Sequence, residues 1–188
     1  MSEIEPGEQV AGDQPRLVGV VVALPEPFAS ELKSWRASFG DPLAEVVPGH
    51  ITLVTTTPAE DWQAVLEHVR AVAAEQHGFQ VQLQGTGAFR PVSPVVYLNV
   101  VRGFEDCVAL HEKLQDGPLA RDLPFPFYPH VTVAHDVSEL AMDEAQRRLA
   151  SYQAEFPVDS MGLYEHDADG VWQLQEELFF GGQEDSES

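Results

Sequence analysis

Two tetrapeptides with the same pattern constrain this chain more than any other feature of its sequence. Each has a histidine, an apolar residue, a threonine and a second apolar residue: His50-Ile51-Thr52-Leu53 and His130-Val131-Thr132-Val133. Alternate side chains of a β-strand point to opposite faces, so each histidine shares a face with its threonine while the apolar residues face a core. We therefore expect two strands that each present an imidazole beside a hydroxyl.

The recurrence of this pattern favours a functional role. In a chain with seven histidines, a second match to so restricted a pattern arises by chance in about one sequence in a thousand. The alternative is that both histidines are ordinary half-buried residues at the start of β-strands. We interpret the pair as functional.

The rest of the chain alternates strands and helices around these two strands. Besides the histidine strands, we expect strands over residues 17–24, 79–87, 95–101, 156–164 and 171–180, and helices over 28–39, 59–77, 103–115 and 139–151. The order strand, helix, histidine strand, helix, strand thus occurs twice, and one strand follows at the end. This order indicates two lobes of similar build.

Length and composition suit one folded unit. A chain of 188 residues that is 44% hydrophobic can bury a sizeable core. The acidic ends, residues 1–15 and 182–188, are predicted to be disordered, which leaves 16–181 as a single two-lobed domain. No apolar run reaches the length of about eighteen residues that a membrane helix needs, and the N-terminus lacks the features of a signal peptide. We expect a cytoplasmic monomer with no membrane partner.

The excess of acidic residues limits the kinds of molecule that the protein can bind. A net charge of −21 argues against binding to extended duplex nucleic acid, which depends on many Lys and Arg contacts to phosphate. A small anionic ligand in a local pocket remains compatible with this charge. The single cysteine, Cys107, excludes an intrachain disulfide and is expected to be buried and inert.

Two histidines that face each other across a cleft suit acid and base chemistry. An unperturbed imidazole titrates near pH 6.5, roughly, so it can give or take a proton at neutral pH. Hydrolysis or cyclisation at a phosphodiester needs both roles, because a nucleophile loses a proton and a leaving oxygen gains one. The hydroxyls of Thr52 and Thr132 are placed to hydrogen-bond the phosphate oxygens.

Other chemistries have weaker support. Two histidines could ligate zinc or iron, but such a site usually has a third protein ligand, and the sequence has neither H-E-x-x-H nor a cysteine cluster. A serine hydrolase would need a G-x-S-x-G turn, which is absent. The segment 85–90 is not a dinucleotide fingerprint, because it ends in arginine and precedes a strand. We therefore predict no metal and no cofactor.

The paired tetrapeptides resemble those of the 2H phosphoesterase superfamily, in particular its 2′-5′ RNA ligase-like branch of RNA 2′,3′-cyclic phosphodiesterases. The resemblance spans residues 17–180 and includes Gly87-Ala88-Phe89 before the 95–101 strand and the stretch 128–134 around the second motif. It implies an α+β fold of two pseudo-repeated lobes. Each lobe would have an antiparallel β-sheet with flanking helices, and the active-site cleft would lie between the lobes.

The resemblance also implies an activity and site residues. A relative of this kind hydrolyses 2′,3′-cyclic phosphates to 2′-phosphates, and some join or split 2′-5′ linkages. By motif position, His50 would protonate the leaving 3′ oxygen, His130 would activate water, and Thr52 and Thr132 would hold the phosphate. The two histidines are nearly symmetric and exchange roles in the reverse direction.

The sequence marks the residues that would contact the substrate less clearly than it marks the two motifs. Phe89 and Tyr128 are candidates for contact with the base or ribose, and ordinary packing is the alternative interpretation. Where the family often has an arginine shortly after the second motif, this chain has His135. A protonated His135 could meet phosphate, and Arg90 and Arg102 are candidates to replace the charge.

Two hypotheses of different classes follow. The first is a metal-independent phosphoesterase that acts on a small nucleotide or short oligonucleotide with a cyclic phosphate or a 2′-5′ linkage. The second is a non-catalytic nucleotide- or phosphate-binding protein with the same fold. The sequence does not identify the substrate or the pathway.

Overall fold

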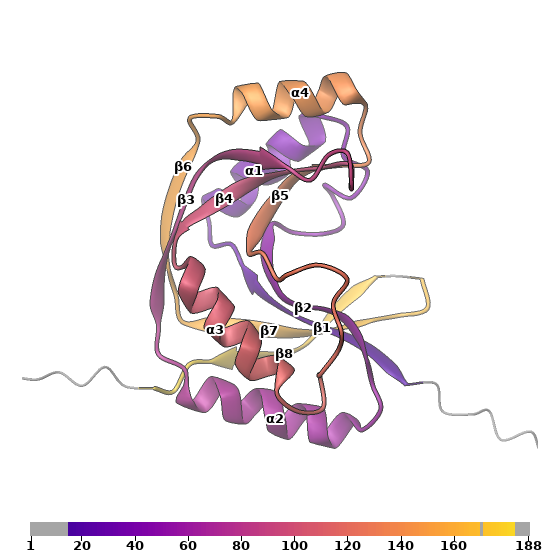
Figure 1. Ribbon diagram of the computed structural model, residues 1–188, viewed down its shortest axis with the longest axis vertical. Helices are drawn as coiled ribbons and strands as arrows, with labels where there is room; N and C mark the ends of the chain where they lie inside the picture. The colour runs from indigo at the N-terminus through magenta and orange to yellow at the C-terminus, as the bar shows by residue number, and fades with distance from the viewer. Residues whose placement is uncertain (1–14, 170, 183–188) are drawn as a thin grey trace, which may run out of the picture.

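One curled antiparallel sheet forms the frame of the molecule (Figure 1). The computed structural model describes residues 15–169 and 171–182. Its strands are β1 (Arg16–Ala23), β2 (His50–Ala59), β3 (Phe79–Ala88), β4 (Val95–Arg102), β5 (His130–His135), β6 (Gln153–Val158), β7 (Ser160–His166) and β8 (Trp172–Phe179). Its helices are α1 (Phe28–Ser38), α2 (Trp62–Glu75), α3 (Phe104–Gln115) and α4 (Glu139–Arg148).

The two predicted lobes are the two halves of this sheet. The strand order is β6-β3-β4-β5-β2-β1-β7-β8, so β2 and β5 lie side by side in the centre. Their ladder contains one residue pair, Ile51 with Val131. Each lobe combines segments from both halves of the chain. One lobe contains β3 from the first half together with β4, β5 and β6, and the other contains β1 and β2 together with β7 and β8 from the second half. In Figure 1, α1 and α4 lie at one end and α2 and α3 at the other.

The predicted strand over 156–164 is wrong as a single element. It divides at Asp159 into β6, which pairs with β3, and β7, which pairs with β1. Phe156 and Val158 are buried and the next buried residue is Met161, so the alternation shifts by one position at Asp159 and Ser160. The division depends on the pairing of distant strands, which the local sequence does not encode.

The first histidine strand also continues through Pro58, although a proline usually ends a strand. Pro58 lies inside β2, opposite Leu17 of β1. Among the described strands, β2 is paired on both sides only at Ile51, and a proline is tolerated where one edge of a strand is free. Helix α2 begins later than predicted because the Asp61 carboxylate accepts a hydrogen bond from the Ala64 amide at 3.1 Å.

The predicted alternation on the histidine strands is confirmed. Ile51, Leu53, Val131 and Val133 are fully buried in the core. The motif histidines and threonines are half-buried on the other face of the same strands. The apolar positions therefore anchor both strands, and the polar positions remain available for chemistry.

A buried ion pair fixes the segment that leads into β2. The Arg36 guanidinium of α1 lies 3.2 Å from the Asp41 carboxylate, and the side chains are 6% and 0% exposed. Arg36 also donates to the Val47 carbonyl, and Asp41 accepts from the Leu43 amide at 2.9 Å. Helix α1 is thereby tied to the residues immediately before His50.

We expect Asp41→Ala to lower the free energy of unfolding by about 3–5 kcal/mol, because it leaves the buried Arg36 cation without its partner. Urea denaturation followed by circular dichroism measures this change. The control is Glu45→Ala, which removes the exposed partner of Lys33 (side chains 51% and 72% exposed) and should cost at most about 1 kcal/mol. Equal losses in the two variants would contradict the structural role of the buried pair.

Candidate active site

The strand pairing brings the two tetrapeptides together at the centre of the sheet. His50 begins β2 and His130 begins β5, and the strands run antiparallel with Ile51 opposite Val131. His50 and Thr132 therefore lie on one side of this pair, and Thr52 and His130 on the other. Each histidine is placed beside the threonine of the other motif, so all four polar side chains share one face.

Both histidines are held by the same local hydrogen bond. The Nδ1 atom of His50 lies 2.7 Å from the Pro48 carbonyl oxygen, and Nδ1 of His130 lies 2.7 Å from the Tyr128 carbonyl oxygen. A carbonyl accepts only, so each neutral ring carries its proton on Nδ1. Nε2 is then the lone-pair nitrogen that can take a proton from a substrate or from water.

Burial shifts the titration of both rings. Desolvation lowers the pKa of His50, the Pro48 carbonyl opposes this, and the Arg36 cation and His130 lower it further. Desolvation likewise lowers the pKa of His130, with the Tyr128 carbonyl opposing. Both imidazoles are therefore neutral at pH 7 in the free protein, and each becomes a stronger proton donor once it is protonated.

Aromatic rings lie next to both histidines. The Phe89 ring meets His130 edge to face with centroids 4.9 Å apart, and the Tyr97 ring lies 5.4 Å from His130. On the other side, the Trp172 ring lies 5.9 Å from His50. The sequence indicates Phe89 as a site residue but not Tyr97 or Trp172, because nothing local in the strands that carry these two marks a site.

A cavity of about 670 Å³ opens beside the motifs. It brings together four residues that the sequence predicted for the site: Thr52, Phe89, Tyr128 and His130. Its remaining walls include the proline- and phenylalanine-rich segment 123–127 that precedes the second motif. Hydroxyls and aromatic rings are thus the main groups that a bound molecule would meet.

His111 also lines this cavity, although the sequence did not mark it. Its ring stacks on Phe127 with centroids 3.9 Å apart, and its Nδ1 lies 2.6 Å from the Leu53 carbonyl oxygen. His111 is 8% exposed. These contacts fix the aromatic segment against β2, so His111 supports the cavity wall.

Two of the predicted substrate residues lie away from the cavity lining. Arg90 donates to Glu139 at 2.9 Å and Asp143 at 3.0 Å, and also to Gln146, so α4 carboxylates neutralise its charge. His135 ends β5 with its Nδ1 3.5 Å from the Asp136 carboxylate. Arg102, the other candidate for the replaced charge, is bonded to Glu155 at 3.1 Å.

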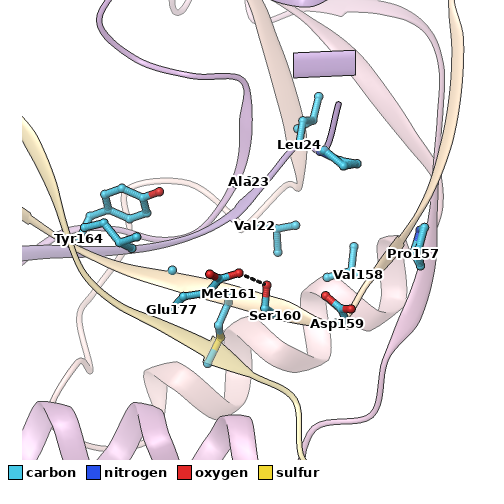
Figure 2. Close-up of a pocket in the computed structure, with 13 residues that line it drawn as sticks. Val22, Ala23, Leu24, Pro157, Val158, Asp159, Ser160, Met161, Tyr164 and Glu177 are labelled. Atoms are coloured by element: carbon cyan, nitrogen blue, oxygen red, sulfur yellow. Dashed lines mark hydrogen bonds between the residues drawn. The ribbon is translucent and has the colours of Figure 1, made fainter. Parts of the chain in front are cut away.

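A second cavity, of about 420 Å³, lies where β1, β7 and β8 meet (Figure 2). Asp159 and Glu177 line it, and Glu177 accepts a hydrogen bond from Ser160 at 3.1 Å. No Lys or Arg is among its described lining residues. Carboxylates without a cation repel phosphate, so the cavity beside His130 is the better candidate for a phosphate ester.

Cys107 is fully buried, as predicted, and burial raises the pKa of its thiol to about 12. None of the described helices is long and apolar enough to cross a membrane. Residues 15–169 and 171–182 contain no group of three His, Cys, Asp or Glu side chains arranged to hold a metal ion.

The profile of the 2′-5′ RNA ligase superfamily matches residues 24–170, a stretch that includes both tetrapeptides. The chain belongs to this superfamily of 2H phosphoesterases. A protein of Geobacillus sp. (strain WCH70) named "Putative phosphoesterase" is 31% identical over 143 residues, which are 74% of this chain and 82% of the relative. A second phosphoesterase relative, from Geobacillus kaustophilus and named in the same way, is 29% identical over 170 residues, covering 88% and 97% of the two chains.

Solved structures of the superfamily share the fold. Escherichia coli LigT complexed with ATP has a TM-score of 0.66 and 23% identity, covering 90% of this chain and all (100%) of LigT. The Thermus thermophilus protein TT0787 has a TM-score of 0.64 and 22% identity, covering 89% and 100%. The predicted two-lobed α+β fold is thereby confirmed.

We expect ¹⁵N-detected NMR to show His50 and His130 as Nδ1–H tautomers at pH 7.5, each with a pKa below 6.5. The carbonyl bonds set the tautomer, and burial lowers both pKa values. Exposed His77 serves as the reference ring for the titration. An Nε2–H tautomer at either motif histidine would contradict the described hydrogen bonds.

Proposed function

We propose that this protein is a metal-independent phosphoesterase that hydrolyses 2′,3′-cyclic phosphate or 2′-5′ phosphodiester bonds of nucleotides or short RNA. The observation that carries the proposal is the matched pair of histidines. Both rings use Nδ1 for a main-chain carbonyl, and both lie on the face that carries Thr52 and Thr132. Membership of the superfamily supports the reaction class.

The proposed reaction uses the two imidazoles in opposite protonation states. Neutral His130 takes a proton from water through Nε2 as the water oxygen attacks phosphorus. Protonated His50 gives its Nε2 proton to the leaving oxygen as the P–O bond breaks. The Pro48 and Tyr128 carbonyls favour the imidazolium form of each ring, and the threonine hydroxyls donate to the non-bridging oxygens.

The cavity beside His130 is proposed to take the nucleobase. Phe89 and Tyr128 line it, their ring centroids are 6.2 Å apart, and they meet edge to face. A planar base can stack on such rings. In support, the related LigT has been crystallised with 3′-AMP, ATP and NADP⁺. The net charge of −21 favours a ligand with few phosphates over a long duplex.

We expect His50→Ala and His130→Ala each to lower kcat/KM for nucleoside 2′,3′-cyclic phosphates by about 10²–10⁴-fold, the usual contribution of a general acid or base. Hydrolysis is followed by chromatography of the phosphomonoester product. EDTA is present throughout, and the wild-type rate should not change when it is added. His77→Ala, at an exposed position of the chain, is the control and should retain full activity.

Unchanged turnover in either motif variant would refute the two-histidine mechanism. Loss of activity in EDTA, restored by a divalent ion, would refute the metal-independent chemistry. Binding of a 2′-phosphorylated nucleotide without turnover of any cyclic or 2′-5′ substrate would favour the non-catalytic alternative.

We expect kcat/KM to follow a bell-shaped pH profile with its maximum below pH 6.5. The active form has one neutral and one protonated histidine, and both pKa values lie below 6.5. Above the maximum the acid loses its proton, and below it the base becomes protonated. Initial rates between pH 4 and 8 test this. A maximum above pH 7.5 would show that the burial effect does not govern the reacting histidines.

A further inference from the structure

Most of the ten Lys and Arg residues of the chain already lie beside a carboxylate and are less available to bind an anion. Seven lie within 4 Å of a carboxylate: Arg16, Lys33, Arg36, Arg70, Arg90, Arg102 and Arg148. Of the remaining three, Lys113 and Arg147 lie on helices α3 and α4, and Arg121 lies on the segment between α3 and β5. Arg121 alone of these three hydrogen-bonds a histidine strand, through Nη1 to the Thr56 carbonyl of β2.

Thr56 of β2 has a second partner, on β7. Its hydroxyl lies 3.5 Å from both ring nitrogens of His166, the last residue of β7. Burial lowers the pKa of His166, so its ring is neutral at pH 7 and offers one N–H. Arg121 and His166 thus both contact Thr56, at its carbonyl and at its hydroxyl respectively, four residues along β2 from Thr52.

The Trp172 ring lies next to both His166 and His50. Its ring centroid lies 4.1 Å from that of His166 and 5.9 Å from that of His50. The indole lies against Gly19 of β1, where an added Cβ would come within 3.1 Å of the ring. The glycine therefore lets the indole lie close to the sheet, between His50 and His166.

The spacing fits a second phosphate and not the scissile one. Thr56 is four residues beyond Thr52, but β2 has register shifts here, so that residues 52–57 lie opposite only residues 18–21 of β1 and span about 10 Å. A guanidinium at that distance is out of reach of a phosphate held between the two motifs. Of the acidic groups at this end, Glu165 lies 3.7 Å from Arg16, and the Asp167 carboxylate accepts the Asp169 and Val171 amides at 2.9 Å. Asp167 also favours a positive charge on His166, and Asp122 follows Arg121 in the chain.

We propose that Trp172, His166 and Arg121 form a strip that binds the chain of an oligonucleotide beyond the scissile phosphate, so that the preferred substrate is an oligonucleotide end. The inference rests on the proposed function and extends it. A base stacks on Trp172, and a further phosphate meets the guanidinium of Arg121 and the N–H of His166. Single-stranded nucleic acids are generally bound in this way, by aromatic rings alternating with cations.

The test compares adenosine 2′,3′-cyclic phosphate with a triadenylate that ends in a 2′,3′-cyclic phosphate. We expect kcat/KM to be at least about 10-fold higher for the trinucleotide, the range that one stacked base and one phosphate contact supply. In Arg121→Gln and in Trp172→Ala, the ratio of the two values should fall toward one. Arg70→Gln removes an exposed arginine bonded to Glu176 and should keep the wild-type ratio.

Affinities are measured in parallel by fluorescence anisotropy, with competition of both unlabelled compounds against a labelled trinucleotide in the His130→Ala background. Failure of the two proposals is then distinguishable. A wild-type ratio near one, or a ratio unchanged in Arg121→Gln, overturns the strip while hydrolysis stands. If neither compound is turned over, the proposed function fails, and the affinity ratio still decides whether the strip exists.

Discussion

The single backbone pairing between Ile51 and Val131 is the constraint on which the site depends. It joins two four-stranded halves into one sheet and places the starts of β2 and β5 next to each other. Because the strands are antiparallel, the pairing also sets each histidine beside the other motif's threonine. The apolar residues that flank the pair are fully buried on the opposite face, so the same alternation that forms the core fixes the polar face.

Main-chain groups then orient the reactive rings. The Pro48 and Tyr128 carbonyls each precede their histidine by two residues, which means that the local backbone selects the tautomer in both lobes. On the first lobe this backbone is itself held by Arg36, through the Val47 carbonyl and the buried pair with Asp41. On the second lobe the approach to His130 is held by stacking of Phe127 on His111. Two different sets of contacts thus support the same motif in the two lobes.

The sequence predicted what depends on local order. Alternation gave the histidine strands and the buried positions 51, 53, 131 and 133, and the local patterns gave the order of the elements as far as α4. The exchange of β3 and β7 between lobes could not be predicted, since it depends on which distant strands pair. For the same reason Tyr97, His111 and Trp172 were not marked as neighbours of the motifs. Arg90 and Arg102 were reasonable candidates by chemistry, but only the fold reveals their carboxylate partners.

The two histidines, alike in sequence, differ in electrostatics. Both lose hydration on burial, but only His50 also has the Arg36 cation among the groups that lower its pKa. His130 instead faces the rings of Phe89 and Tyr97, whose π-electrons tolerate a neighbouring imidazolium. The Arg36 cation opposes protonation of His50, whereas the aromatic rings beside His130 do not oppose a positive charge, so these surroundings alone favour the proton on His130. The proposed roles, with His50 as acid and His130 as base, therefore require the negative charge of the bound phosphate to stabilise the imidazolium of His50.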